Sequence, residues 1–356
     1  MDTVTEPASA AAGKLDERYR RLIAAEPGLR IRDAAERLGS SELALLRLGH
    51  GGEATLLGGD FAALLQEAGS LGRVMALTRN ACCVHERKGV YEKFAFYAEG
   101  VGLTVGKDID LRLFMRHWRH GVAVEQTRGE RRARSLQFFD ADGHAVHKIH
   151  LLEDSDTGAF ARLVARHAGR PPPAAAPDEA AEPLLTDEAL ADAGVFHAEW
   201  DALRDTHDFA GLLKRHHLDR RAAFRLAGPR RAERLDRLAH RAVFGGAQAQ
   251  GLAIMVFVGN RGCIQIHTGP VVHLRQTGDW FNVLDPDFNL HLLEPLVDQA
   301  WLVRKPTVDG TVTSVECYDA AGRPLMFVFG RRKPGEAENA AWRALAEAAP
   351  RHGAQP

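Results

Sequence analysis

The sequence lacks any long apolar run, and its positive and negative charges almost cancel. No stretch approaches the roughly 18–20 apolar residues that a membrane-spanning helix needs. The first residues, MDTVTEPASAAAGKLDERYRR, contain no apolar segment of the kind that marks a secretory signal. The formal net charge of -1 gives no global reason to expect binding to nucleic acid or to an anionic membrane surface. We therefore expect no membrane insertion, and nucleic acid is not an expected partner.

Cysteine is scarce, because the chain has four and none belongs to a C-x-x-C motif. Cys82 and Cys83 are adjacent, a spacing at which a mutual disulfide is rare, and Cys263 and Cys317 are isolated. This usage predicts reduced thiols in the core of a protein from a reducing compartment. Together with the missing signal segment, it predicts a cytoplasmic location.

The chain is long enough for more than one core. Its 356 residues suggest about two or three domains, and 45% hydrophobic and 26% charged residues are ordinary for a folded protein. The stretch 169–185, GRPPPAAAPDEAAEPLL, is rich in proline and alanine and predicts a linker. We therefore expect two structural segments, an N-terminal one over 1–168 and a C-terminal one over 186–356.

The two segments resemble each other. RNACCVHERKG (79–89) and GNRGCIQIHTG (259–269) match at a separation of 180 positions. SLQFFDADG (135–143) and SVECYDAAG (314–322) match at a separation of 179, which indicates a small deletion in a loop. Two matches in the same order predict an internal duplication. The pairs at the first match are Asn80 with Asn260, Cys83 with Cys263, and Gly89 with Gly269.

The matched pieces have the patterns of strands joined by turns. AIMVFVG (253–259) and TVTSVECYD (311–319) are rich in β-branched and aromatic residues, and DADG and DAAG supply turns. Helical apolar spacing precedes the strands at 15–27, 30–49 and 198–218. The expected class is α+β, a tandem structural repeat in which each half is a large antiparallel sheet flanked by helices.

The stretch DAAERLGSSELALLRL, within 30–49, also has the spacing of a helix-turn-helix motif. It leaves DNA recognition as an alternative function for the N-terminal helices. No basic run follows it to bind phosphates, so the pattern favours ordinary paired helices.

Among the 17 histidines, His207 stands out by its context. It falls in the expected helix 198–218, where Trp200, Leu203, His207 and Ala210 would form one stripe. A haem iron ligand needs such a setting, because the imidazole must reach the iron while the porphyrin requires dry surroundings. Spacing alone more often reflects a buried structural histidine bonded to a backbone carbonyl, and it leaves both interpretations open.

Cationic residues occur in places that suit a ligand with carboxylates, such as haem. Arg220 follows the helix of His207, Lys305 ends the strand AWLVRKPT, and Arg332 follows the strand MFVFG. Arginine or lysine at strand ends can bind carboxylates, and we expect each of these three to be partly exposed. The alternative is ordinary solvated charge at strand ends.

Several longer motifs resemble the HemS/HmuS-type family of haemin-degrading factors. They are DIDLRLFMRHW, LRDTHDFAGLLKRH, VFVGNRGCIQIHTGPV, WFNVLDPDFNLHLLE and AWLVRKPTVDGTVTS, and the resemblance runs from about Leu15 to Ala348, the linker excepted. The resemblance implies a tandem repeat and one haem held in a cleft to which both halves contribute.

The resemblance also implies roles for individual residues. The family's iron-binding histidine matches His207 in the motif DTHDF, which favours the ligand interpretation, and its other ring nitrogen is expected to donate to a carbonyl or a carboxylate. The family's distal arginine matches Arg112 in DLRLF, which makes Arg112 the candidate catalytic residue. The remaining implied haem contacts are Phe114 and Phe257 against the porphyrin and Arg220, Lys305 and Arg332 at the propionates.

The sequence departs from the family at Phe327 and Phe329, where some members have glutamine and tyrosine, so two polar contacts to the haem edge are expected to be missing. The implied function is cytoplasmic haem binding after import, in haem trafficking or in oxidative haem degradation. No nicotinamide or flavin fingerprint occurs, so electrons would come from outside. Implied partners are haem, a haem importer, a haem oxygenase or an external reductase. The alternatives are a pure carrier that delivers to a separate haem oxygenase and a haem-responsive DNA-binding regulator.

Overall fold

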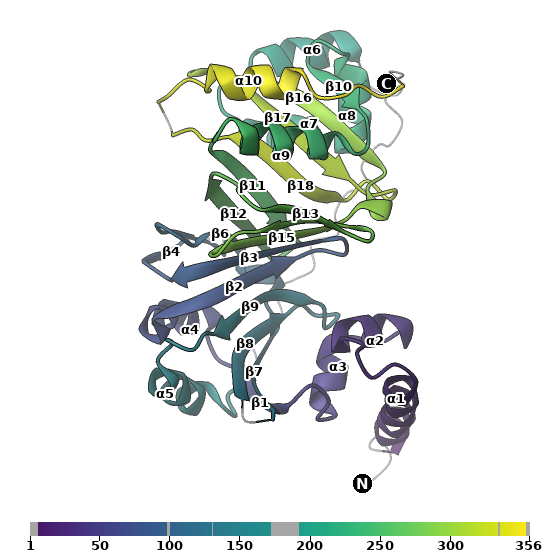
Figure 1. Ribbon diagram of the computed structural model, residues 1–356, viewed down its shortest axis with the longest axis vertical. Helices are drawn as coiled ribbons and strands as arrows, with labels where there is room; N and C mark the ends of the chain where they lie inside the picture. Colours follow the sequence, from purple (N-terminus) through teal and green to yellow (C-terminus); the bar gives the residue numbers. More distant parts are fainter. Residues whose placement is uncertain (1–5, 98–99, 130, 172–191, 334, 354–356) are drawn as a thin grey trace. The chain divides into compact units, whose positions relative to one another are not determined.

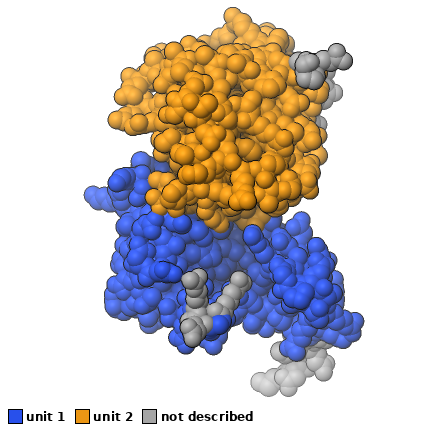
Figure 2. Space-filling model, viewed as in Figure 1, with its two compact units in different colours: residues 1–78, 88–176, 260–263 blue, residues 79–87, 177–259, 264–356 orange. Residues whose placement is uncertain are grey.

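A computed structural model describes residues 6–97, 100–129, 131–171, 192–333 and 335–353 (Figure 1). The chain forms two compact units, which Figure 2 distinguishes by colour. Unit 1 contains residues 1–78, 88–176 and 260–263, and unit 2 contains residues 79–87, 177–259 and 264–356. Of the expected linker 169–185, residues 172–185 lie outside the described residues.

The elements of unit 1 come from the first half of the chain. Its helices are α1 (Glu6–Ala25), α2 (Ile31–Arg37), α3 (Glu42–Arg47), α4 (Phe61–Glu67) and α5 (Thr157–His167), with short 3-10 helices at Ala68–Leu71 and Met115–His117. Its strands are β1 (Glu53–Leu57), β2 (Arg73–Arg79), β4 (Phe94–Phe96), β5 (Val101–Val105), β6 (Asp110–Phe114), β7 (His120–Arg128), β8 (Arg131–Phe139) and β9 (Ala145–Leu151). Strand β3 (Cys83–Val90) is divided between the units at Arg87.

The elements of unit 2 come from the second half. Its helices are α6 (Ala193–Asp201), α7 (Asp208–Arg215), α8 (Arg220–Ala227), α9 (Ala239–Ala249) and α10 (Ala340–Glu347), with a 3-10 helix at Glu294–Leu296. Its strands are β10 (Ala232–Leu235), β11 (Ile254–Gly259), β12 (Cys263–Gly269), β13 (Leu274–Thr277), β14 (Trp280–Leu284), β15 (Phe288–Leu293), β16 (Gln299–Thr307), β17 (Gly310–Tyr318) and β18 (Pro324–Gly330).

The strands form two sheets of nine strands each. Their orders are β1-β7-β8-β9-β2-β3-β15-β14-β13 and β10-β16-β17-β18-β11-β12-β6-β5-β4. The hairpins β8–β9 and β17–β18, at the DADG and DAAG turns, are antiparallel, as the sequence predicts. The expected α+β tandem repeat, with large antiparallel sheets flanked by helices, is therefore confirmed.

Each unit packs helices on its strands through alternating side chains. In unit 1, α4 and α5 cover β2, β8 and β9, and α2 and α3 lie against the other side of β7. In unit 2, α9 and α10 bury one face of β11, β17 and β18, and α6, α7 and α8 pack over β16 and the neighbouring part of β17. All four cysteines are buried free thiols, as the sequence predicts. No described helix is long and apolar enough to cross a membrane.

The duplication extends to the hydrogen bonds of two matching hairpin turns. In the first turn the Asn80 amide N–H donates to Cys83 O at 3.0 Å, and Asn80 Oδ1 accepts from the amide N–H groups of Cys82 and Cys83. Asn260 makes the same turn with Cys263, at 2.9 Å, and its Oδ1 accepts from Gly262 and Cys263. The predicted equivalence of these pairs is confirmed.

The two asparagines also bind equivalent carbonyls. Asn80 Nδ2 donates to Leu325 O at 2.8 Å within unit 2, and Asn260 Nδ2 donates to Val146 O at 2.9 Å within unit 1. Both carbonyls lie where strand pairing shifts its register, in β17–β18 and in β8–β9. Each half of the chain therefore places an asparagine-capped turn against a bulge of the other half's unit.

A buried polar cluster in the core of unit 1 is replaced by apolar residues in unit 2. His147 is 1% exposed, its Nε2 lies 2.6 Å from Tyr91 Oη, and its Nδ1 lies 2.8 Å from Thr78 Oγ1. Burial raises the pKa of Tyr91 well above its usual value, so its hydroxyl stays protonated and donates to Nε2. At the repeat separations the corresponding residues of unit 2 are Val258, Val271 and Met326, all in its apolar core.

Replacing Asn80 or Asn260 with alanine should lower the free energy of unfolding by about 1–3 kcal/mol in each case, because each change leaves buried carbonyl and N–H groups without partners. The measurement is the midpoint of urea unfolding. Arg261→Ala is the matched control, since Arg261 lies in the same turn with a side chain 58% exposed. If both asparagine variants unfold like this control, the side chains do not hold the turns.

The His147 cluster predicts a loss of stability in acid. Burial lowers the pKa of His147 to about 3, whereas an unfolded chain binds this proton below a pH of about 6.5. Stability is therefore lost as pH falls from about 6.5 towards 3, by roughly 2–3 kcal/mol at pH 4.5. The variant Thr78→Val/Tyr91→Phe/His147→Met makes the cluster apolar, as its counterpart in unit 2 is, and should remove this part of the loss in unfolding curves recorded at pH 7 and 4.5. An unchanged pH dependence would contradict the assignment.

Candidate functional site

The segment around His207 is not the continuous helix that the sequence predicts. Helix α6 ends at Asp201 and α7 begins at Asp208. Between them Asp205 Oδ1 accepts from the amide N–H of His207 at 2.8 Å, and Asp208 Oδ2 accepts from the amide N–H of Asp205 at 3.1 Å. These reciprocal bonds start a new helix, as in a capping box, so the expected helix over 198–218 is wrong.

His207 therefore lies at the N-cap of α7, and its side chain is 90% exposed. It does not share the buried stripe of Trp200 and Leu203, which pack in the core. Its Nδ1 lies 2.6 Å from Asp205 Oδ1. Of the two partners expected for the second ring nitrogen, a carbonyl or a carboxylate, the structure has the carboxylate. The bond from the His207 backbone N–H holds the pKa of Asp205 below its usual value, and the charge of Arg332 adds to this effect. Nε2 is thus the nitrogen left to meet a ligand.

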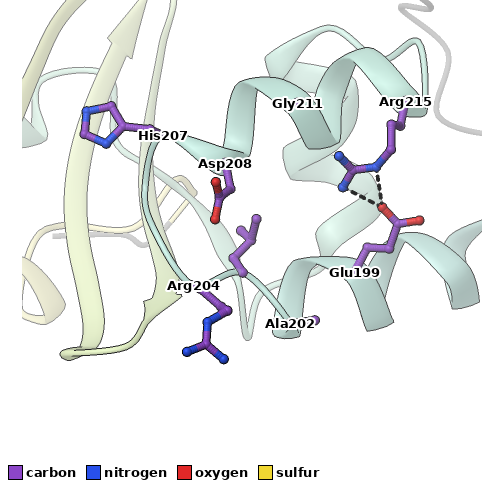
Figure 3. Close-up of a pocket in the computed structure, with 8 residues that line it drawn as sticks. Glu199, Ala202, Arg204, His207, Asp208, Gly211 and Arg215 are labelled. Carbon is purple, nitrogen blue, oxygen red and sulfur yellow. Dashed lines mark hydrogen bonds and ion pairs between the residues drawn. The ribbon is translucent and has the colours of Figure 1, made fainter.

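A hollow of about 630 Å³ lies beside this loop. Figure 3 shows its lining by α6, α7 and the loop between them, with His207 projecting away from the ion pair of Glu199 and Arg215. Glu199 Oε2 accepts from Arg215 Nη2 at 2.8 Å. The loop is also tied to the β16–β17 turn, since the Val308 amide N–H donates to Arg204 O at 2.9 Å.

The sheet of unit 2 presents a half-buried apolar face next to α7 and α8. Along β11 and β18 the side chains alternate between fully buried residues, which pack under α9 and α10, and residues that are half-buried. The half-buried set, which we name the aromatic face, consists of Met255, Phe257, Phe327 and Phe329. Phe257 and Phe329 pack edge to face with ring centroids 5.0 Å apart. The predicted porphyrin contact Phe257 thus belongs to a larger aromatic surface.

A buried carboxylate, Glu316, connects the cations at the border of this face. It is 0% exposed and accepts from Lys305 Nζ at 2.8 Å and from Arg220 Nη1 at 3.3 Å. Tyr318 Oη and Ser314 Oγ donate to the same carboxylate. Burial alone would raise the pKa of Glu316, but the charges of Lys305 and Arg220 and the hydrogen bonds lower it to about 2. Two cations on one carboxylate leave one positive charge in excess.

The three predicted propionate partners have different surroundings. Lys305 is 4% exposed, so the expectation of partial exposure is wrong for this residue; Glu316 and the ring of Phe209 bury it. Arg220 is half-buried and lies 5.2 Å from the ring centroids of both Phe209 and Phe327. Arg332 is half-buried, and its Nη1 is buried with no hydrogen-bond partner among the described residues. Arg220 and Arg332 are therefore the cations that can still bind an anion.

Arg112 and Phe114 lie in β6 of unit 1 and share one side of that strand with Asp110. Leu111 and Leu113 point to the other side and are fully buried. Arg112 forms an ion pair with Asp110, and its side chain is 35% exposed. Its role therefore stays a prediction from the family resemblance.

Glu316 and Phe209 are two residues of this site that were not predicted from the sequence. A usable signal was present, because Glu316 is a charged residue inside the apolar strand TVTSVECYD, and Lys305 is another inside AWLVRKPT. A charged side chain at such a position needs a partner of opposite charge. If the two strands are taken to be neighbours in the sheet, Lys305 and Glu316 become partners of each other. Phe209 carried no comparable signal, because an apolar residue in an amphipathic helix is unremarkable.

Known proteins resemble this chain in both sequence and structure. A family described as the haemin-degrading HemS/ChuX domain matches residues 39–167 and 217–349. The hemin transport protein HemS of Yersinia enterocolitica is 38% identical over 334 residues, which are 92% of this chain and 94% of that protein.

Two solved structures have similar folds. Holo-PhuS, a heme-binding protein from Pseudomonas aeruginosa, superposes with a TM-score of 0.89 at 46% identity and covers 96% of this chain and 99% of its own. The heme degrading enzyme ChuS of Escherichia coli O157:H7 gives a TM-score of 0.85 at 33% identity, with 95% and 99% covered. The chain therefore belongs to the HemS/ChuX family of haemin-degrading proteins.

Proposed function

We propose that this protein is a cytoplasmic haem-binding protein that acts after haem import, with His207 as the ligand of the haem iron. The observation that carries the proposal is the exposed imidazole of His207, which Asp205 holds through Nδ1 at 2.6 Å. A carboxylate on the second ring nitrogen fixes the tautomer and raises the basicity of Nε2, as it does in metal sites generally. Relatives whose names describe hemin transport, heme binding and heme degradation support the same ligand.

The surroundings of His207 in unit 2 suit the rest of a haem molecule. The aromatic face offers Phe257, Phe327 and Phe329 to an apolar macrocycle. Phe327 and Phe329, the two departures from the family pattern, replace polar contacts with apolar area. At the border of this face Arg220 and Arg332 can bind the propionates. Lys305, which is buried and bonded to Glu316, adds positive charge nearby.

The corresponding surface of unit 1 is a poor haem site, which supports one haem per chain. At the repeat separation Lys148 stands where Phe327 stands, and it forms a buried ion pair with Glu42 at the start of α3. Glu42 is the first residue of its helix, as Arg220 is of α8, so the charge at this position is reversed. With Lys148 and His150 in place of Phe327 and Phe329, and a carboxylate in place of Arg220, this face offers haem less apolar area and less positive charge.

We infer two uses of the bound haem, trafficking and oxidative degradation. Haem would supply iron that binds and activates dioxygen. Following the family resemblance, we keep Arg112 as the candidate catalytic residue and Phe114 as a porphyrin contact, because a guanidinium could donate hydrogen bonds to negative charge that develops during the reaction. The deciding experiment adds a reductase and catalase to the haem complex and follows the Soret band. Decay to a tetrapyrrole product in the wild type but not in Arg112→Ala supports degradation, whereas a stable band with transfer to a separate haem oxygenase supports the carrier.

His207→Ala should abolish the normal ligation spectrum and weaken haem binding by more than about tenfold, because no other imidazole occupies this position. Haem titration followed at the Soret band measures both effects. His216→Ala and His217→Ala are matched controls that should keep the spectrum. They follow the last residue of α7, nine and ten residues after His207, which at 1.5 Å per residue is about 14–15 Å along the axis. A His207 variant with the wild-type spectrum and affinity would overturn the proposal.

A further inference from the structure

Glu316 competes for the cations that the proposed function gives to haem. It is bonded to both Arg220 and Lys305, and a haem propionate is the same chemical group, a carboxylate. A ligand carboxylate that approaches Arg220 or Lys305 meets a cation that already has a partner. Because Glu316 and a propionate would bind the same cations, Glu316 affects the affinity for haem as well as the packing of the core.

We propose that Glu316 is a built-in competitor of the ligand's carboxylates: it holds Arg220 when the site is empty, and the exchange of Arg220 from Glu316 to a propionate sets how readily haem is released. This inference rests on the proposed function. It assigns to Glu316 a positioning role, since Glu316 acts through Arg220 and need not contact haem.

Arg220 is the cation that can exchange. Its bond to Glu316 is the longer of the two, 3.3 Å against 2.8 Å for Lys305, and its side chain is 30% exposed against 5%. Its guanidinium already lies over Phe327, a member of the aromatic face. A turn of this side chain would move its N–H groups to the border of that face, while Lys305 stays bonded and keeps Glu316 neutralised.

The repeat provides an internal control for this position. At the repeat separation Gln137 of unit 1 stands where Glu316 stands, and Gln126 stands where Lys305 stands. The neighbouring serine bond is kept, because Gln137 Nε2 donates to Ser135 Oγ at 3.0 Å and Ser314 Oγ donates to Glu316 at 2.9 Å. The sheet therefore accepts a neutral amide at this position. A carboxylate occurs there in unit 2, where Lys305 and Arg220 are also present.

The test compares Glu316→Gln with the wild type, using haem and haem dimethyl ester, which has no free carboxylates. With haem, the variant should bind about tenfold more tightly and release haem about tenfold more slowly to excess apomyoglobin, since a hydrogen bond to a charged group contributes roughly this much. With the dimethyl ester, wild type and variant should agree. The ligand-free variant should unfold at a lower temperature, because a buried cation loses its partner, and haem should restore more stability to it than to the wild type.

Two further variants keep the test decisive. Gln137→Glu makes the reverse change at the equivalent position of unit 1 and should leave haem release unchanged. If Glu316→Gln does not fold, Lys305→Gln/Glu316→Gln, which copies the pair in unit 1, should bind haem about tenfold more tightly than Lys305→Gln alone.

Three results separate the possible failures. Equal or weaker haem binding by Glu316→Gln overturns the competition, and so does an equal gain with the dimethyl ester, because the effect would then come from packing. If the wild type binds no haem at all, the proposed function fails, and this outcome is distinct from an unchanged Glu316 variant in a protein that does bind.

Discussion

Glu316 lies inside a β-sheet with none of its surface exposed, and a carboxylate in such a position has to be neutralised where it stands. Lys305 from the next strand does most of this, and Arg220 at the start of α8 completes it. Phe209 of α7 then covers both cations with its ring. The placement of α7 and α8 over β16 and β17 is therefore linked to one charge. Because α7 begins at the His207 loop, the same charge helps to place the loop that carries the exposed imidazole.

The two units show how one fold can take different chemistry at equivalent places. Unit 1 has a polar cluster around His147 where unit 2 has valine and methionine, and unit 2 has its charges at Glu316 and Lys305 where unit 1 has two glutamines. In both cases the backbone hydrogen bonds of the repeat are retained. The fold therefore depends on strand pairing and on the asparagine-capped turns, and individual core positions are free to specialise.

Sequence reasoning predicts the repeat, the antiparallel hairpins and the buried thiols well, because these depend on local periodicity and on turn residues. It fails at the helix before His207, where the side chains of Asp205 and Asp208 override the apolar spacing and start a new helix. It also misplaces Lys305 at the surface, because its partner Glu316 is on another strand and strand pairing is not visible in a single chain. The exchange of Arg79–Arg87 and Asn260–Cys263 between the units is invisible for the same reason. Asp205 is inside the recognised motif, but only the structure gives its bond to His207.

The exchanged turns have a consequence for the history of the chain. A duplicated gene usually leaves two copies of which either can be lost, because each folds by itself. Here Asn80 binds a carbonyl of the second half and Asn260 binds a carbonyl of the first, so each copy contributes to the stability of the other. Once that exchange existed, deletion of either copy would have left the survivor with an open bulge. The exchange thus links the two copies, since loss of either one would remove a turn that packs in the unit of the other.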